Sequence, residues 1–460
     1  MKTLIHNAEI VNEGHRFHGG LLIEDDRIAE VFEGEPKSLN DALCTLNCID
    51  AEGAMLMPGI IDTHVHFREP GLTHKADIAH ESRAALAGGV TSTMDMPNVY
   101  PPTTTTERWL ERMETGARES RVNYAYYIGA QPLPQPSPVG REMAPLQGTM
   151  DSAPSLQGRA SERVPIKLFM GSSTGNMLID KREELLTVFR TAAKTGRLVV
   201  THCEDTPRIN ERMAEAQTRW GEDPDVSHHP WIRDDEACYR SSALAVELAR
   251  ETGARLHIAH ITTERELSLI DNERITGEAC VAHLLFCEED YARLGTRIKC
   301  NPAVKGCQDR DALRRAVADG HLLTIATDHA PHLLSEKQGG CVRAASGMPM
   351  VQFSLVTMLG LADEGVLTLE RVVDAMCHQP ALLFNIKERG FLRPGYKADL
   401  VLVNRHDWTL RPENIFSKCG WSPLEGRTLH WQVQQTFLNG HLAYDHGHIK
   451  DTVRGEALEL

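Results

Sequence analysis

The sequence of 460 residues lacks the features that mark membrane proteins and nucleic-acid-binding proteins. No apolar run approaches the ~20 residues that a membrane-spanning helix needs, and polar residues interrupt the N-terminal segment where a signal peptide has its apolar centre. Basic residues are in the minority, with 49 Lys and Arg against 64 Asp and Glu and a net charge of −15. This balance argues against binding to nucleic acid or to an anionic membrane. We therefore expect a cytoplasmic protein with neither partner.

Closely paired cysteines are also absent. The eleven cysteines are scattered without a Cys-x-x-Cys pair, and most lie within apolar stretches. This distribution is typical of reduced cysteines in a protein core, not of a disulfide framework or a zinc knuckle. The remaining composition, with 41% hydrophobic and 25% charged residues, is that of an ordinary globular protein. The length suits two or three domains, or one large α/β barrel with an appendage.

Both ends of the chain have the pattern of short strands joined by tight turns. Residues 4–11 and 20–32 read as a strand and a hairpin, and residues 399–403 read as another strand. Near the C-terminus, Asn439 and Gly440 separate two apolar runs, and this dipeptide favours a type I′ hairpin turn. We therefore expect a small β-sandwich domain assembled from residues 1–56 and 390–460.

Between these ends, short apolar runs alternate with helical patterns. The first helical pattern covers residues 75–87, and a Pro-, Gln- and Ser-rich segment at residues 131–161 is expected to form a long irregular loop. The eight apolar runs begin at Ile60, Val90, Val122, Ile166, Leu198, Leu256, Gly277 and Leu322. Eight repeats of strand then helix predict a (β/α)8 TIM-type barrel over residues 57–389, with its active site at the C-terminal ends of the strands.

Ligand-type side chains stand at the ends of several predicted strands. His64 and His66 are two residues apart on a strand, so both imidazoles lie on one face, which is metal-ligand spacing. Alone, the pair fits two hydrogen-bonded histidines equally well. Other predicted strands end in Lys167, His202, His260 and Asp328. Because the strands of a barrel converge at one end, these residues are expected to point at the same place.

Lys167 is the least expected member of this set, because an ammonium group within an apolar strand is costly unless it is neutral or paired. A neutral lysine can add CO₂ and become a carbamate, whose two oxygens can bridge two divalent cations. The alternative is a lysine that reaches the barrel mouth or pairs with an acidic residue. Four histidines, a carboxylate and a carbamate suit two such ions, with Zn²⁺ the first choice and Mn²⁺, Co²⁺ or Fe²⁺ as substitutes.

Asp328 is the candidate acid–base residue of this predicted centre. Divalent cations lower the pKa of a water that they bind, and Asp328 is expected to take a proton from that water and pass it to a leaving nitrogen. The alternative role for Asp328 is to cap a helix in a barrel loop.

Two longer motifs give the sequence a recognisable resemblance. Residues 58–71 (PGIIDTHVHFREPG) and 327–332 (TDHAPH) resemble the two signatures of the dihydroorotases, in the cyclic amidohydrolase branch of the amidohydrolase superfamily. Residues 96–98 (MPN), 260–263 (HITT) and 395–402 (GYKADLVL) extend the resemblance over nearly the whole chain. Taken together these motifs are highly specific, although His-x-His alone is weak.

The resemblance implies a role for each matching residue. The metal ligands implied are His64, His66, Lys167 as a carbamate, His202, His260 and Asp328, and Asp328 is also implied as the catalytic base. Arg68, Asn98 and His332 match the residues that hold the substrate's carboxylate, and Asn301 matches the asparagine that contacts the pyrimidine ring. The implied reaction is the reversible hydrolysis of dihydroorotate to N-carbamoyl-aspartate in pyrimidine synthesis. The family also implies a homodimer.

The sequence departs from the family pattern at a few places and leaves alternatives open. Residues 347–352 (GMPMVQ) replace a Gly-x-x-Gly-Leu-Glu pattern, and Lys305 lies near a position where an arginine is common. An allantoinase or dihydropyrimidinase would share the metal site, but their substrates lack the exocyclic carboxylate that Arg68 and His332 would bind. A catalytically silent scaffold is the third reading, and such relatives typically lose metal ligands.

Overall fold

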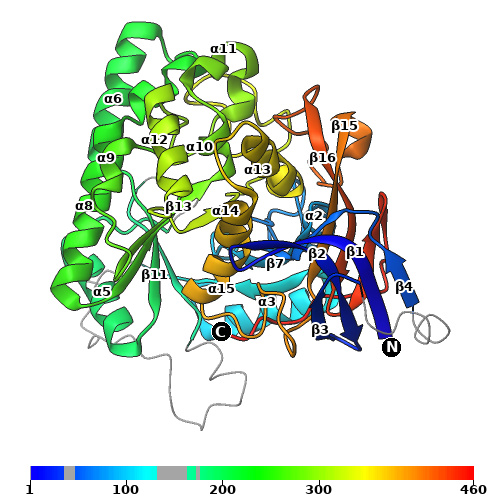
Figure 1. Cartoon of the computed structure of the whole chain (residues 1–460). Helices are drawn as coiled ribbons and strands as arrows, with labels where there is room; N and C mark the ends of the chain where they lie inside the picture. Colours follow the sequence, from blue (N-terminus) through cyan, green and yellow to red (C-terminus); the bar gives the residue numbers. More distant parts are fainter. Residues whose placement is uncertain (1, 36–46, 132–162, 172–176) are drawn as a thin grey trace.

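The computed structural model describes residues 2–35, 47–131, 163–171 and 177–460. The expected irregular loop at residues 131–161 therefore lies, apart from Gln131, outside the described residues. Figure 1 shows a barrel with helices around it and, at one side, a sheet made of strands from the N-terminal and C-terminal parts of the chain. Across the described ranges, none of the helices has the length and apolar character needed to cross a membrane.

The barrel follows the predicted alternation of strands and helices. One parallel sheet has the order β6 (Ile60–Val65), β7 (Val90–Asp95), β8 (Asn123–Tyr126). The other has the order β14 (Thr324–Ala326), β13 (Ile275–Cys280), β12 (Arg255–Ile258), β11 (Leu198–His202), β10 (Ile166–Phe169), β9 (Ile128–Gly129). Only Tyr127 separates β8 from β9, and a parallel bridge joins Val65 to His329. The two sheets therefore meet at both edges and close the predicted (β/α)8 barrel.

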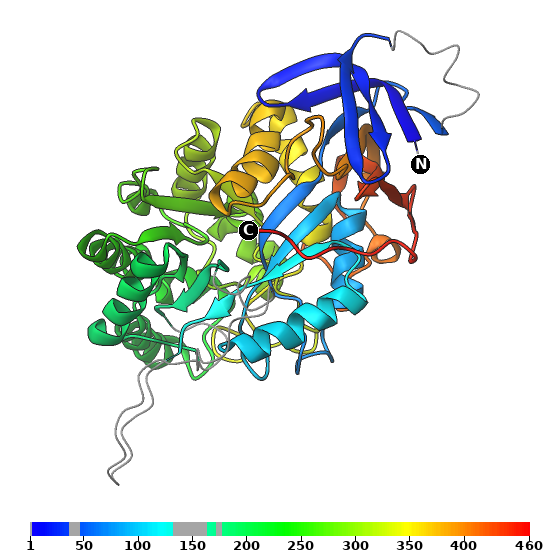
Figure 2. The same ribbon diagram turned by 90° about the horizontal axis from the view of Figure 1, so that it is seen from below.

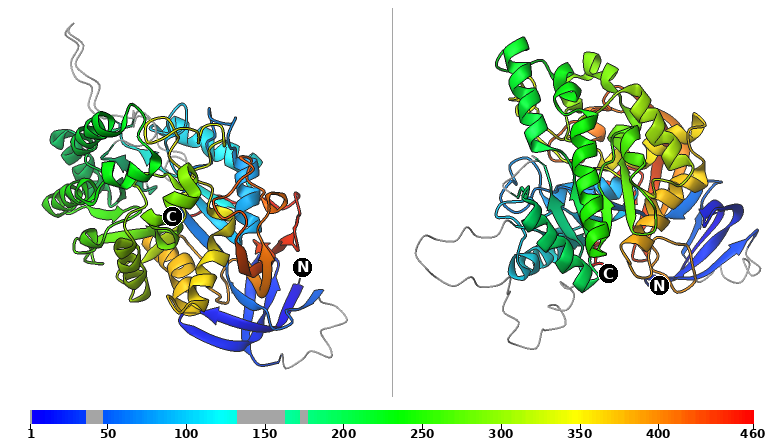
Figure 3. Two further views of the ribbon diagram at one scale, coloured as in Figure 1. Left: turned by 90° about the horizontal axis from the view of Figure 1, so that it is seen from above. Right: turned by 90° about the vertical axis from the view of Figure 1, so that its left-hand side faces the viewer.

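Helices cover the outer face of these strands, so strands such as β6, β7 and β11 are buried along their whole length (Figures 1 and 3). The α-helices are α2 (Ile78–Ala87), α3 (Thr106–Glu119), α5 (Arg182–Thr195), α6 (Thr206–Trp220), α7 (His229–Ile232), α8 (Asp235–Thr252), α9 (Glu264–Leu267), α10 (Val281–Leu285), α11 (Tyr291–Leu294), α12 (Cys307–Ala318), α13 (Ser354–Asp363), α14 (Leu369–Val373) and α15 (Gln379–Leu383). Short 3-10 turns are η1 (Val226–His228), η2 (Glu288–Asp290), η3 (Gly295–Ile298), η4 (Val351–Phe353) and η6 (Pro412–Asn414), and η5 (Asp374–His378) is a π-helix.

The first helix begins later than its spacing predicts. Helix α2 starts at Ile78 and not at residue 75, because the Asp77 carboxylate accepts a hydrogen bond from the His80 backbone N–H at 2.9 Å. This capping bond satisfies one of the free N–H groups at the helix start. Lys75 consequently lies in the loop before the helix, and its side chain contacts His332 and Glu336.

The ends of the chain form one nine-stranded sheet. Its order is β18 (His448–Ile449), β17 (His441–Asp445), β16 (Thr428–Leu438), β15 (Leu400–Thr409), β5 (Met55–Pro58), β1 (Lys2–Asn12), β2 (His15–Glu24), β3 (Arg27–Glu33), with β4 (Asn47–Asp50) paired to β1. Strand β5 joins the two ends, because it pairs with β1 on one side and β15 on the other. Figure 2 shows this sheet beside the barrel. Asn439 and Gly440 both have positive φ angles, 48° and 78°, as the predicted type I′ turn requires.

The terminal sheet has an apolar core of its own. Ile10, Leu21, Leu56, Leu400 and Phe437 belong to a buried cluster that is separate from the main cluster of the barrel. The proposed domain limit between residues 56 and 57 falls inside β5, which then leads through Gly59 into the first barrel strand. The barrel and the sheet are therefore connected by a continuous, buried stretch of chain.

One cysteine pair differs from the expectation of reduced core cysteines. Cys287 and Cys307 form a disulfide bond with a Cα–Cα distance of 4.9 Å. Cys287 follows α10 and Cys307 opens α12, and the packing of these two helices brings the residues together although 20 positions separate them. The expectation is therefore wrong for this pair. The other cysteines within the described ranges have free thiols.

Candidate metal-dependent active site

The first two predicted ligands leave the C-terminal end of β6. A buried carboxylate beneath them, Asp62, accepts hydrogen bonds from the backbone N–H groups of His64 at 3.1 Å and Thr327 at 3.2 Å. Thr327 Oγ1 also donates to Asp62 at 2.5 Å. Asp62 therefore ties β6 to the end of β14, and so fixes the two histidines relative to the segment that carries Asp328.

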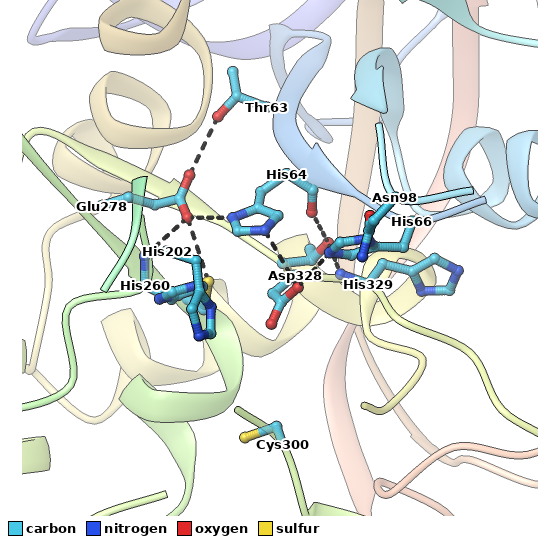
Figure 4. Close-up of polar contacts among 12 residues, drawn as sticks. Thr63, His64, His66, Asn98, His202, His260, Glu278, Cys300, Asp328 and His329 are labelled. Atoms are coloured by element: carbon cyan, nitrogen blue, oxygen red, sulfur yellow. Dashed lines mark hydrogen bonds and ion pairs between the residues drawn. The ribbon is translucent and has the colours of Figure 1, made fainter. Parts of the chain in front are cut away.

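Four imidazoles form a continuous row at the mouth of the barrel (Figure 4). The ring centroids are 4.8 Å apart for His202 and His260, 5.3 Å for His260 and His64, and 5.4 Å for His64 and His66. His202 Nδ1 and His260 Nε2 face each other at 3.0 Å. Burial lowers the pKa of His66 to about 4, so its ring is neutral at neutral pH. Neutral imidazole is the form that binds metal ions.

Asp328 lies at one end of this row. Its Oδ1 is 3.0 Å from His66 Nε2 and 3.3 Å from His64 Nε2. One donor atom each from His64, His66 and Asp328 lie within 4.8 Å of one another, a spacing that could hold a metal ion. Two imidazole nitrogens and a carboxylate oxygen are the donors that zinc and related divalent metals take in catalytic sites.

Lys167 enters the same region from β10 and has an uncommon environment. Its side chain is almost fully buried, and among the described residues its Nζ has no hydrogen-bond partner. Burial lowers the pKa of Lys167, although the carboxylates of Glu278 and Asp328 oppose the shift. A buried amine without a hydrogen bond is costly to keep in the charged form. Burial therefore favours the neutral form of this amine, and the neutral form is what the carbamate hypothesis requires.

Two buried carboxylates accept hydrogen bonds from histidines of the row, and neither was expected from the sequence. Glu278 on β13 accepts from His64 Nδ1 at 2.8 Å and from the His260 backbone N–H at 3.2 Å (Figure 4). Glu204 accepts from His202 Nε2 at 3.0 Å and pairs with Arg233. Such partners fix the orientation of a metal-binding imidazole and which nitrogen carries the proton. In the sequence, Glu278 could have been noticed as an acidic residue inside an apolar strand. Glu204 could have been noticed as an acidic residue two positions after the strand-end histidine His202.

Three of the predicted site residues have left-handed backbone conformations. The φ angles are 69° for Arg68, 40° for His260 and 48° for Asp328. Positive φ is uncommon for residues other than glycine, and each instance costs on the order of 1–3 kcal/mol. The surrounding hydrogen bonds must maintain these conformations. These positive φ angles give the three side chains directions at the strand ends that an extended backbone would not give them.

The two signature segments meet through Arg68 and His332. Arg68 is 2% exposed, its Nε donates to the Pro331 carbonyl at 3.2 Å, and its Nη2 lies 3.1 Å from His332 Nε2. An arginine at this depth is rare without an anionic partner. The guanidinium and the imidazole therefore make a buried, cationic corner two residues from His66.

The two predicted asparagines have different surroundings. Asn98 Oδ1 accepts from His66 Nδ1 at 2.8 Å, so this amide orients one of the row's histidines. Asn301 Oδ1 accepts from His229 Nε2 at 3.1 Å. Within the part of the chain that the structure describes, no hydrogen bond links Asn301 to the imidazole row. The expected contact of Asn301 with a substrate ring stays a prediction.

Known proteins resemble this chain over nearly its full length. Residues 55–443 match the model of the amidohydrolase family. A dihydroorotase of Halobacterium salinarum is 35% identical over 81% of this chain and 82% of its own, and one of Lactobacillus delbrueckii is 29% identical over 97% and 100%. An allantoinase of Bacillus velezensis is 28% identical over 97% and 94%.

Solved structures give the same fold. The L-hydantoinase (dihydropyrimidinase) of Arthrobacter aurescens superposes with a TM-score of 0.87 over 97% of both chains, at 24% sequence identity. At this identity the likeness concerns the fold alone. The family model covers the strands that carry the imidazole row, and the sequence identity to the Halobacterium protein extends over most of both chains. The chain therefore belongs to the amidohydrolase family.

Proposed function

We propose that the protein is a dihydroorotase, which hydrolyses (S)-dihydroorotate reversibly to N-carbamoyl-L-aspartate in de novo pyrimidine synthesis. The observation that carries the proposal is the buried corner of Arg68 and His332 beside the imidazole row. A guanidinium offers forked donors that match a carboxylate, and dihydroorotate carries a carboxylate outside its ring. The Halobacterium and Lactobacillus relatives bear the name dihydroorotase. The homodimer and the cytoplasmic location stay predictions.

The donor set of the site fits two divalent cations, for which Zn²⁺ is our proposal. We assign as ligands His64, His66, His202, His260, Asp328 and a carbamate on Lys167. The carbamate would form when the unprotonated Lys167 amine attacks CO₂ and loses a proton, and the buried Nζ without a hydrogen bond supports this step. When bound, such ions polarise a carbonyl and lower the pKa of water.

The residues of the chain would then bind the substrate and move one proton. Arg68, Asn98 and His332 would hold the exocyclic carboxylate, and Asn301 would contact the ring. Asp328, oriented by His64 and His66, would accept a proton from the attacking water and deliver it to the ring nitrogen as the C–N bond breaks. The reverse reaction uses the same residues in the opposite order.

A second candidate is an allantoinase or a dihydropyrimidinase-type cyclic amidase. The specific observation in its favour is the Bacillus velezensis allantoinase, at 28% identity over nearly the whole of both chains. The substrates of these enzymes lack the exocyclic carboxylate, which leaves the buried Arg68 without a role. A silent scaffold is disfavoured because all six ligand positions carry residues that can bind metal.

A substrate panel tests the proposal. Wild-type protein of measured metal content is assayed with dihydroorotate, allantoin and dihydrouracil. We expect dihydroorotate to have the highest kcat/KM, and Arg68→Met to lower that value by about ten- to a hundredfold through loss of a charge-assisted hydrogen bond. Preference for allantoin or dihydrouracil, or unchanged dihydroorotate turnover in Arg68→Met, would contradict the assignment. A metal-replete protein inactive on all three compounds would favour the scaffold.

A further inference from the structure

His332 lies between two cationic side chains. Arg68 Nη2 is 3.1 Å from its Nε2, and Lys75 Nζ is 3.2 Å from its Nδ1. Lys75 comes from the loop before α2 and is only 8% exposed. The Lys75 ammonium also donates to Glu336 Oε1 at 3.1 Å. From its sequence position, Lys75 was expected only as the first residue of a helix.

A neutral imidazole cannot accept hydrogen bonds from both of these neighbours. Burial and the charges of Arg68 and Lys75 hold the pKa of His332 well below its usual range, so the ring is neutral. A neutral ring has one N–H donor and one acceptor nitrogen. If Nδ1 accepts from Lys75, the proton lies on Nε2 and faces Arg68. If Nε2 accepts from Arg68, the proton lies on Nδ1 and faces Lys75.

We propose that Lys75 is a positioning residue that sets the tautomer of His332, so that Nε2–H is presented to an anionic carboxylate held by Arg68. The inference rests on the proposed function, because that function supplies the carboxylate. With Lys75 donating to Nδ1, the ring's only N–H lies on the Arg68 side. A carboxylate at Arg68 then receives hydrogen bonds from both the guanidinium and the imidazole.

Glu336 explains why Lys75 is needed. Its Oε2 lies 3.5 Å from His332 Nδ1 and already accepts from the Leu333 backbone N–H at 2.8 Å. Without the Lys75 ammonium, this carboxylate remains beside His332 Nδ1 and favours a proton there. Nε2 would then present a lone pair toward the carboxylate of the substrate. That arrangement replaces a hydrogen bond with a repulsive contact.

The test compares ligands with and without a carboxylate. Zinc-loaded wild-type, Lys75→Met and Lys75→Arg proteins are titrated by calorimetry with orotate, which carries the carboxylate but is not hydrolysed, and with uracil, which lacks it. Lys418→Met is the matched control, because Lys418 Nζ binds the same loop at the Thr73 carbonyl (2.6 Å) and Asp77 (2.7 Å). Its head group is bonded to these two residues and not to His332.

We expect the orotate Kd of Lys75→Met to rise about ten- to a hundredfold, the range of a charge-assisted hydrogen bond. Uracil binding should be unchanged, Lys75→Arg should stay within about threefold of wild type, and Lys418→Met should equal it. For dihydroorotate, Lys75→Met should raise KM and leave kcat unchanged. Orotate binding unaffected by Lys75→Met, or uracil binding weakened as much as orotate binding, overturns the inference.

Nitrogen NMR of the wild-type protein gives an independent measurement, which serves even if Lys75→Met does not fold. Two-bond ¹⁵N–¹H correlations distinguish the tautomers, and His332→Asn identifies the signal. We expect His332 to carry its proton on Nε2, and a proton on Nδ1 would refute the inference. If orotate binding depends on Lys75 but dihydroorotate is not hydrolysed, the proposed function is wrong and the inference is supported. Wild-type protein that does not bind orotate would exclude the inference directly.

Discussion

Replacing Glu278 with glutamine tests whether the carboxylates behind the imidazole row organise a metal centre. Glu278 is 1% exposed and accepts from His64 Nδ1 at 2.8 Å and from the His260 backbone N–H at 3.2 Å. Glutamine has the same length, but it has no charge and only one accepting oxygen. In the wild-type protein the Glu278 anion holds the proton of His64 on Nδ1, so that the unprotonated Nε2 faces Asp328. The substitution removes this anion.

The expected loss follows from the number of bonds affected. One Glu278 oxygen serves both histidines, so a single substitution loosens two proposed ligands at once. Loss of a partner behind a metal-binding histidine typically weakens metal binding by about 10- to 100-fold. This range corresponds to about 1.4–2.7 kcal/mol of binding free energy. We place Glu278→Gln toward the upper end of the range.

Zinc affinity is measured by competition with a chromophoric chelator at constant pH. Glu266→Gln is the control, because Glu266 is also buried but binds Ser242 at 2.7 Å and Thr263 at 2.9 Å, away from any histidine of the row. The control should keep wild-type affinity within about threefold. A Glu278→Gln protein with wild-type zinc affinity, or equal losses of affinity in both variants, would refute this role of Glu278.

Two further predictions concern a proposed metal ligand and a buried ion pair near the site. Lys167→Ala should lose metal that elemental analysis detects in wild type, because the proposed carbamate cannot form; undiminished metal content would contradict the carbamate. Arg112→Met should destabilise the fold by about 3–5 kcal/mol in urea unfolding, because it leaves the buried Asp95 without its ion-pair partner. The exposed Arg118, paired with Glu119, provides the control, and Arg118→Met should cost no more than about 1 kcal/mol.

The barrel could be predicted because its strands are short, mostly apolar runs that alternate with helical patterns. Residues 60–65 show this directly, since every position of β6 is buried and the proposed ligands His64 and His66 lie at its C-terminal end. The alternation of such runs with helical spacing leaves few other topologies. The start of α2 was less predictable, because the Asp77 cap and not the apolar spacing determines where the helix begins.

The site was predictable only where the sequence itself carries the geometry. The spacing of His64 and His66 fixes their common direction, because side chains alternate along a strand. Glu278 escaped prediction because its partner His64 is 214 positions away and its role depends on how β13 faces β6 across the barrel. Lys75 and the cysteine pair escaped for the same reason. Their contacts arise from packing between segments, and nothing in the sequence indicates that these segments lie next to each other.

The position of β5 between β1 and β15 has a consequence for how the protein is made. The ribosome releases β1 and β5 early, whereas β15 emerges only after the barrel has been synthesised. At typical rates of translation this delay is on the order of tens of seconds. Throughout this time one edge of β5 is unpaired, and an unpaired edge is a site for association with other chains. Nascent chains should therefore be most vulnerable to aggregation before the last strands emerge, and slower translation should lengthen that period.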